Sequence, residues 1–316
     1  MQVAVAGEAL IDMASTGPLA FQGHVGGGPL NSAVAYVRMG HPCGFITQLS
    51  TDLFGDQLHR FMQESGIDTQ FVTRSDAPST LAFVERTPQT NRYAFFTRGS
   101  ADGTWSPATL PALPDECRLL QYGGISLLQE PAAGRITELV AASAERRLIV
   151  LDPNVRPSLI PDLQAYRMRF ERWLGSTHLL KLSDEDAALL APGVGLADAA
   201  ARWLQSGPSA VVVTLGAKGA VLYRRNRAPI EVTAPRVTVA DTIGAGDTFT
   251  AGLASSLLDA GVANNRQLAE LPDAPWHLAM RFAATAAALN CTREGADPPT
   301  LAEVQQALAT SPGAAG

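Results

Sequence analysis

The sequence has few cysteines, and the three it contains are far apart: Cys43, Cys117 and Cys291. No two of them form a CxxC pair, and no cluster of cysteine and histidine has the spacing of a zinc site. A sparse, odd number of cysteines argues against a disulfide framework and favours a reducing compartment.

Long apolar runs and basic clusters are also missing. No stretch approaches the roughly 18 consecutive apolar residues of a membrane span, and the start of the chain has no basic leader, its apolar run being interrupted by Glu8 and Asp12. The formal net charge is −6 without a run of Lys or Arg, which argues against nucleic acid and anionic membranes as partners. We therefore expect a cytoplasmic protein, and its 46% hydrophobic residues can build a sizeable core.

Three common catalytic signatures are absent. The chain contains no GxxxxGK[ST] phosphate loop, no HExxH and no GxSxG. These absences argue against a Walker-type nucleotide site, a zinc peptidase of that class and a serine hydrolase elbow.

Short apolar runs alternate with helical patterns along most of the chain. Strands are expected at 2–7, 43–49, 119–124, 147–152, 177–182 and 209–214, and helices at 31–39, 53–66 and mainly beyond about residue 246. Aliphatic and β-branched runs separated by helices indicate an α/β fold whose mostly parallel sheet is covered on both faces.

Residues 69–98 break this alternation. They contain two strand-like pieces, TLAFVER and RYAFFTR, joined by the turn TPQTN without a helix between them. This pattern predicts an antiparallel hairpin. A hairpin inserted in an α/β fold can serve as a lid over a site, and an edge extension of the main sheet is the alternative.

The stretch DTIGAGDTF, residues 241–249, precedes a helical pattern. The first turn of a helix carries N–H groups without intrahelical partners and partial positive charge, and glycines allow an anion to approach them. Gly244, Ala245 and Gly246 thus predict an anion cradle, and Asp247 stands beside it as a base for an attacking alcohol. A tight turn followed by a favourable first-turn acid is the alternative.

Five ordered motifs resemble those of one family. DTIGAGDTFTAG resembles the C-terminal signature of the PfkB (ribokinase-like) carbohydrate kinases, and GGGPLNSAVAYVRMG at 26–40 resembles their N-terminal signature. LDPNVRP (151–157), KLSDED (181–186) and TLGAKG (214–219) match further family segments, and GEALID, RGSAD and DPNVRPSLI are most similar to bacterial fructokinases. The resemblance implies a single ribokinase-like domain over 1–316. This domain would be a three-layer α/β/α structure with a mostly parallel central sheet and a small β-sheet lid formed by about 13–25 and 68–100.

The resemblance also implies roles for individual residues. Asp247 is the expected catalytic base, and the amides of Gly244, Ala245 and Gly246 form the expected anion hole. The expected sugar-binding residues are Asp12, Gly27, Gly28, Asn31, Arg98 and Arg156. For the glycines a flexible loop is the alternative, for Asn31 a helix cap, and for each arginine a salt bridge.

Nucleotide and cation sites follow from the same resemblance. The expected nucleotide-binding residues are Lys181, Ser183, Thr214, Gly216 and Gly219. Asp186 stands at the position of an acid that helps to organise magnesium, with Glu185 as a rival. A potassium site would use the Asp241 side chain and the carbonyls of Ile243, Asn290, Arg293 and Gly295, although Pro299 stands where ribokinases place a serine.

The expected function is an ATP- and magnesium-dependent sugar kinase, with phosphorylation of the 6-hydroxyl of fructose as the first hypothesis. A 2-keto-3-deoxygluconate kinase and then a ribokinase are the alternatives within this class. A non-catalytic sugar or nucleotide sensor on a kinase fold is the alternative from another class. The family further implies a homodimer formed through the lids.

Overall fold

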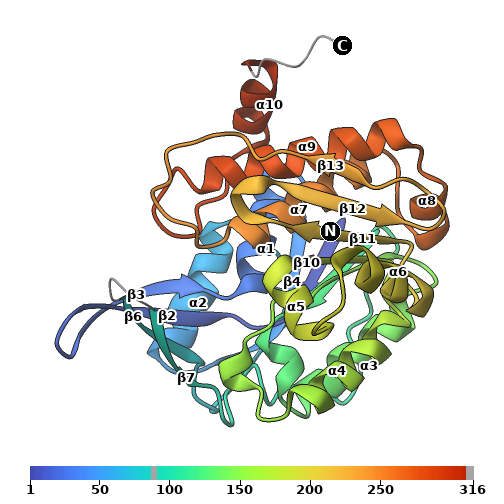
Figure 1. Cartoon of the computed structure of the whole chain (residues 1–316). Helices are drawn as coiled ribbons and strands as arrows, with labels where there is room; N and C mark the ends of the chain where they lie inside the picture. Colours follow the sequence, from blue (N-terminus) through green and yellow to red (C-terminus); the bar gives the residue numbers. More distant parts are fainter. Residues whose placement is uncertain (87–90, 311–316) are drawn as a thin grey trace.

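In a computed structural model, which describes residues 1–86 and 91–310, the chain forms two sheets (Figure 1). The large sheet has the order β13-β12-β11-β10-β9-β8-β1-β4-β5. Its strands are β1 (Val3–Ala6), β4 (Cys43–Ser50), β5 (Val72–Ser75), β8 (Leu119–Gly123), β9 (Leu148–Asp152), β10 (Leu179–Ser183), β11 (Ala210–Thr214), β12 (Ala220–Arg224) and β13 (Ile230–Val232). The strands from β5 to β11 run parallel, and β12 and β13 are antiparallel additions at one edge.

Helices cover both faces of the large sheet because alternate residues of its buried strands point to opposite sides. Val3 and Val5 of β1 enter one core, and Ala4 and Ala6 enter the other. The first core is covered by α1 (Gly28–Arg38), α2 (Leu53–Glu64), α7 (Ala245–Asp259), α8 (Asn265–Glu270), α9 (Asp273–Asn290) and α10 (Leu301–Thr310). The second is covered by α3 (Ala132–Ser143), α4 (Leu163–Leu174), α5 (Asp184–Leu190) and α6 (Leu196–Ser206). The expected three-layer α/β/α fold is confirmed.

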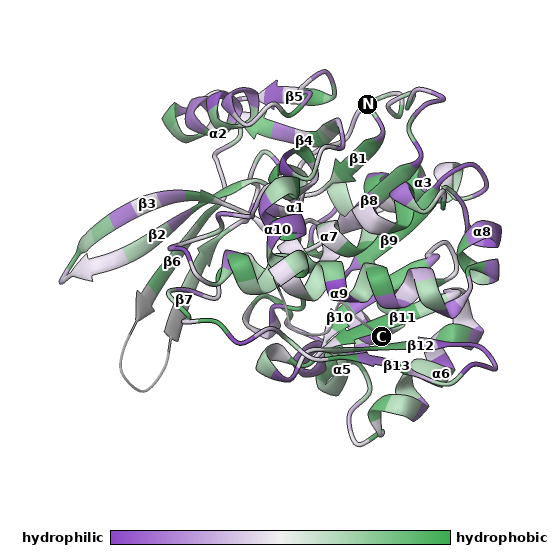
Figure 2. Ribbon diagram, turned by 90° about the horizontal axis from the view of Figure 1, so that it is seen from above, coloured by the Kyte–Doolittle hydropathy of each residue, from purple (hydrophilic) through white to green (hydrophobic). Residues whose placement is uncertain are grey.

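A smaller sheet of order β3-β2-β6-β7 projects from this body (Figures 1 and 2). Its strands are β2 (Leu10–Gly17), β3 (Ala20–Gly26), β6 (Leu81–Arg86) and β7 (Asn91–Phe96). They form two antiparallel hairpins joined by the parallel pair β2–β6. Leu10 and Ala82 pack with Ile125 at its base.

The extent of this sheet differs from the sequence expectation in one part. Within the range 68–100, residues 72–75 form β5, which pairs with β4 at the edge of the large sheet. The hairpin of the small sheet therefore begins at Leu81, and an edge extension and a separate hairpin are both present. Residues 87–90, most of the expected turn TPQTN, lie outside the described residues.

The carboxyl ends of the parallel strands mark one edge of the large sheet. Gly123, Asp152, Ser183 and Thr214 end neighbouring strands there, and three short 3-10 helices follow such ends: Ile125–Leu128, Pro157–Leu159 and Gly216–Lys218. In open α/β sheets this edge is where ligands bind. Within the described residues no helix combines the length and apolar character that crossing a membrane requires.

Candidate active site

Asp247 lies in the first turn of α7, directly after the glycine segment. Gly244 precedes the helix in a left-handed conformation, with φ of 74°, which favours glycine. The amide of Ala245 donates to the Thr242 carbonyl over a long 3.3 Å. Within the described chain the amides of Gly244, Gly246 and Asp247 meet no acceptor, so this turn presents open donors beside a carboxylate.

The start of α1 meets the start of α7 at the carboxylate of Asp247. Asn31 lies one turn inside α1, and its side-chain amide donates to Oδ2 of Asp247 at 2.9 Å. The hydroxyl of Ser32 donates to the Asp247 carbonyl at 3.3 Å. Asn31 is therefore not the helix cap that was its alternative reading, because Gly27 occupies that position.

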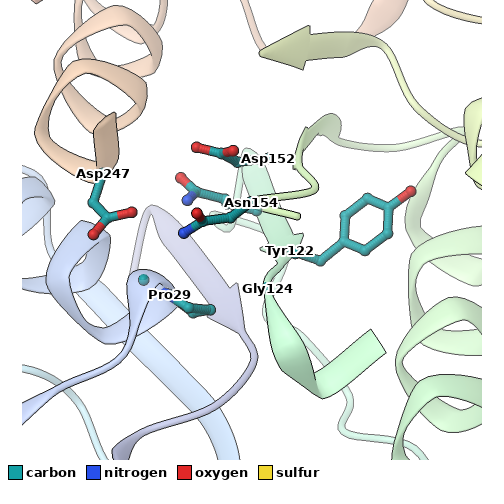
Figure 3. Close-up of a pocket in the computed structure, with 9 residues that line it drawn as sticks. Pro29, Tyr122, Gly124, Asp152, Asn154 and Asp247 are labelled. Atoms are coloured by element: carbon teal, nitrogen blue, oxygen red, sulfur yellow. The ribbon is translucent and has the colours of Figure 1, made fainter. Parts of the chain in front are cut away.

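Gly28 leaves the space in front of this carboxylate open. A Cβ at residue 28 would stand 3.1 Å from Oδ1 of Asp247 and 2.6 Å from Nδ2 of Asn154. Asn154 itself adopts a left-handed φ of 42°. Figure 3 shows Asp247 and Asn154 facing each other across this small pocket, with Asp152 beside them and the ring of Tyr122 turned away.

The environment of Asp247 gives it the proton affinity of a base. Burial and, to a lesser extent, nearby Asp152 raise the pKa of Asp247 to about 6, against the lowering effects of Asn31, Lys181 and Arg156. At neutral pH the group is mostly ionised and still close to its pKa. These are the conditions for efficient proton acceptance.

A second carboxylate flanks the glycine loop on the side of the small sheet. Asp12 lies on β2 opposite His24 of β3, and a Cβ at Gly26 would stand only 2.2 Å from its Oδ2. Burial raises the pKa of Asp12 to about 6, while Arg156 and His24 lower it. Gly27, with φ of 109°, places its backbone against the Glu8 carbonyl. The glycine loop thus lies between the carboxylates of Asp12 and Asp247 and places backbone groups between them.

A groove of about 410 Å³ runs from Asp247 along the carboxyl ends of β9, β10 and β11. Its lining includes four of the five expected nucleotide-binding residues, Lys181, Ser183, Thr214 and Gly216, together with Gly246 of the expected anion hole. Gly219 does not line it; with φ of 108° and a Cβ position 1.9 Å from the Val232 carbonyl, this residue must be glycine for the turn itself.

Three consecutive acids, Asp184, Glu185 and Asp186, also line the groove. Asp186 already accepts the Val155 amide at 3.0 Å and the Ser183 amide at 3.3 Å. The Asp186 amide in turn donates to the Ser183 hydroxyl. Ser183 and Asp186 therefore form a capping box at the start of α5. Burial, then Asp152, raises the pKa of Asp186. Asp186 thus ties α5 to the loop after β9, while Glu185 is exposed.

The residues expected to hold potassium form one cluster behind the α7 turn. The Asp241 carboxylate accepts the amides of Ile243 and Gly295, and the Asn290 side chain donates to the Ile243 carbonyl at 2.8 Å. The Asn290 carbonyl accepts the Arg293 amide. The positions are therefore brought together, with several of their oxygens already hydrogen-bonded.

The two expected arginines differ. Arg156 is exposed and donates to the carbonyls of Asn154 and Val155. It lies close enough to Asp12 and Asp247 to lower the pKa of both carboxyl groups. In the described part of the chain it forms no ion pair. Arg98 is exposed in the turn after β7, and no hydrogen bond or ion pair joins it to a described residue of the site.

Sequence reasoning missed Asp152, Asn154 and Thr250. Asp152 pairs with Lys181 at 2.9 Å and accepts the Thr250 hydroxyl at 2.8 Å. Asp152 and Asn154 stand in the motif LDPNVRP, at the end of a predicted strand. That position, at the edge where ligands bind, is the signal that could have found them.

Comparisons with known proteins identify the family of the chain. Residues 2–303 match the model of the pfkB family carbohydrate kinases. The chain belongs to the pfkB family. A fructokinase of Rhizobium leguminosarum bv. trifolii is 37% identical over 271 residues, 84% of this chain and 83% of that protein. Members of this family of carbohydrate kinases transfer a phosphoryl group to a sugar hydroxyl, so this chain is a phosphotransferase of that kind.

Solved structures of fructokinases are similar over nearly the whole length of this chain. A fructokinase from Xylella fastidiosa with bound ATP superposes with a TM-score of 0.86 at 29% identity, covering 98% of both chains. A fructokinase from Vibrio cholerae O395, bound to fructose, ADP and calcium ion, gives a TM-score of 0.84 at 25% identity and covers 96% of this chain and 97% of that one.

Proposed function

We propose that this pfkB-family kinase is an ATP-dependent fructokinase that phosphorylates the 6-hydroxyl of fructose. The observation that carries the proposal is the buried carboxylate of Asp247, set between the glycine loop of α1 and the open amides of the α7 turn. Similarity to fructokinases, one solved with ATP and another with fructose and ADP, supports the choice of both substrates.

In this proposal the sugar lies in the space that Gly28 leaves open. Asp12 accepts hydrogen bonds from its hydroxyls, and the Asn31 amide orients Asp247. Asp247 takes the proton of the 6-hydroxyl as that oxygen forms its bond to the γ-phosphorus. The bond from phosphorus to the bridging oxygen of ADP breaks, and ADP leaves. The amides of Gly244, Ala245 and Gly246 face the charge on the transferring group.

The groove beside Asp247 is the proposed site of the nucleotide. Its phosphates would lie towards Gly246 and Lys181, and its ribose would lie towards Thr214 and Gly216. Oxygen donors suit magnesium, and the acids Asp184 to Asp186 supply them at the groove. Magnesium bound with the nucleotide would neutralise phosphate charge. Glu185 is the exposed carboxylate available to its water shell, because Asp186 already accepts two amides.

Potassium is the proposed occupant of the Asp241 cluster. The donors are oxygen atoms, as a hard cation requires, and they lie directly behind the α7 turn. An ion there would fix the turn that carries the anion hole.

The small sheet is the proposed lid, and its closure would exclude water as a competing acceptor. Its exposed aromatic cluster supports a homodimer formed through the lids. Phe21, Phe83 and Phe96 stack edge to face at 5.0 and 5.5 Å, and Phe96 is 62% exposed. Apolar rings left in water favour association. Dependence on ATP is consistent with a cytoplasmic location.

Arg156 supports a second candidate, a 2-keto-3-deoxygluconate kinase. It stands near both site carboxylates without an ion pair among the described residues, and a guanidinium can bind the carboxylate of a sugar acid. With neutral fructose it would act as a hydroxyl donor.

Release of ADP, measured in a coupled assay, tests these alternatives on fructose, 2-keto-3-deoxygluconate and ribose. We expect the highest kcat/KM with fructose. Arg156→Ala, with exposed Arg172→Ala on α4 as the control, shows which sugar needs the guanidinium. A preference for the sugar acid that disappears only in Arg156→Ala establishes the second candidate. Tight sugar binding without ADP release from any sugar establishes a sensor.

A further inference from the structure

A buried ion pair lies beneath the α7 turn. Lys181 on β10 and Asp152 at the end of β9 are 4% and 7% exposed, and Nζ and Oδ2 are 2.9 Å apart. Removing two charges from water costs several kcal/mol per ion before their attraction is counted, and apolar residues often pack equally well. A pair in this position therefore needs a reason other than stability.

Hydrogen bonds connect this pair to the first turn of α7. Oδ2 of Asp152 also accepts the Thr250 hydroxyl at 2.8 Å, and the same hydroxyl oxygen lies 2.9 Å from the Gly246 carbonyl. A hydroxyl has one proton, so the two acceptors share it. Lys181 meets the same turn directly, because a Cβ at Gly246 would stand 3.2 Å from its Nζ. The pair thus contacts the turn that carries Asp247 from the side of the sheet.

We propose that Asp152 and Lys181 are a positioning pair for phosphoryl transfer: they hold the first turn of α7 through Thr250 and Gly246, and their opposite charges together set the field at Asp247. Neither residue needs to touch the transferring group for this role. The inference rests on the proposed role of Asp247 as the base.

The charged and polar groups around Asp247 come from four segments. Asn31 faces it from α1, Asp152 from β9, Asn154 and Arg156 from the following loop, and Lys181 from β10. Asp186 of α5 and Tyr166 of α4 lie near Asp152.

Of the pair, Asp152 raises the pKa of Asp247 and Lys181 lowers it. Loss of one partner should therefore move the pKa in one direction, and loss of the other should move it in the opposite direction. A remote ion pair that only stabilises the fold, such as Arg224–Asp273, would leave the Asp247 midpoint unchanged when it is broken.

The test uses Asp152→Asn, Lys181→Met and the double variant. Arg224→Met is the matched control, because it breaks the Arg224–Asp273 ion pair at the far end of β11 and β12, where Arg224 pairs with Ala210. The titration of Asp247 is followed by carbon NMR in sugar-free protein labelled in aspartate carboxyls, and the resonance is assigned by its loss in Asp247→Asn. The acid limb of kcat/KM for fructose is measured in parallel.

We expect Asp152→Asn to lower the Asp247 midpoint by about half a pH unit or more and Lys181→Met to raise it by a similar amount. The midpoint of the double variant returns towards wild type while its kcat stays about tenfold or more reduced, because the charged acceptor of the Thr250 hydroxyl and the Lys181 ammonium beside Gly246 are both lost. Arg224→Met leaves the midpoint in place. Folded single variants that leave the midpoint unchanged, or move it in the same direction, overturn the proposal.

Thr250→Val tests the positioning role without changing a charge. It removes the hydroxyl that joins Asp152 to the Gly246 carbonyl. We expect kcat to fall several-fold with little change in the KM for fructose, and an unchanged kcat refutes this part. If the midpoints shift as expected but no sugar is phosphorylated, the electrostatic effect of the pair on Asp247 stands, and the proposed function falls together with the role of the pair in phosphoryl transfer. If fructose is phosphorylated but the midpoints do not shift, the proposed function stands and the inference about the pair falls.

Discussion

Replacing Asp247 with asparagine should separate catalysis from stability. The folded protein keeps this carboxylate 8% exposed, and burial is the main reason that its pKa rises from 3.8 to about 6. Each pH unit corresponds to about 1.36 kcal/mol, so ionising Asp247 costs the folded state about 3 kcal/mol relative to the unfolded chain. An amide carries no such cost.

The sign of the effect follows from proton binding. The folded state holds the Asp247 proton more tightly, so the wild type loses stability as the pH rises from about 4 through about 6, and the loss is complete above that range. The free energy of unfolding of Asp247→Asn should exceed that of the wild type by about 1.5 kcal/mol at pH 5 and about 3 kcal/mol at pH 8, apart from a pH-independent packing difference. Turnover should fall about 10²–10⁴-fold, because an amide cannot take the proton.

Thermal unfolding of both proteins at pH 5 and pH 8 measures this difference. The offset in Tm should widen by about 2–3 °C at the higher pH for a chain of this size. Asp198→Asn is the matched control, since Asp198 is an exposed acid in the first turn of α6, and its offset should stay within about 0.5 kcal/mol. If the difference in Tm between Asp247→Asn and wild type is the same at both pH values, or is smaller at pH 8, burial does not raise the pKa of Asp247 in the folded state and the reasoning is refuted.

Three further predictions concern the same site. The acid limb of kcat/KM for fructose should have its midpoint near pH 6, the pKa of Asp247, and a profile flat down to pH 5 contradicts this. Gly28→Ala should lower kcat/KM at least about tenfold while nucleotide binding, followed by calorimetry, is retained, because the new methyl group crowds Asn154 and Asp247. Ser183→Ala should lower the stability by about 1 kcal/mol through loss of the capping box, and an unchanged Tm would falsify that assignment.

The large sheet was predictable because its strands are short, aliphatic and buried on both faces. Each predicted strand, from 2–7 to 209–214, overlaps an observed one closely. The position of β5 was not predictable, since its sequence VTRS is polar and only half-buried. Its pairing with β4 depends on backbone hydrogen bonds that leave no apolar pattern in the sequence.

For the site, local motifs identified the residues but not their neighbours. The sequence placed Asp247 and its glycines at the start of a helix because that arrangement is local. The hydrogen bond from Asn31 to Asp247 joins residues 216 positions apart, and the ion pair of Asp152 with Lys181 joins two adjacent strands. Such contacts depend on the order of strands in the sheet, which periodicity does not reveal.

The same contacts explain why glycine occurs in both motifs. At Gly28 the place of a Cβ is taken by the Asn154 amide and the Asp247 carboxylate, and at Gly246 it lies against the Lys181 ammonium. Each glycine is therefore needed less for chain flexibility than for the close approach of polar groups contributed by other segments. A methyl group at residue 28 would crowd the Asp247 carboxylate directly, and one at residue 246 would crowd the Lys181 ammonium beside it. The two motifs thus meet the same structural requirement, although they lie far apart in the sequence.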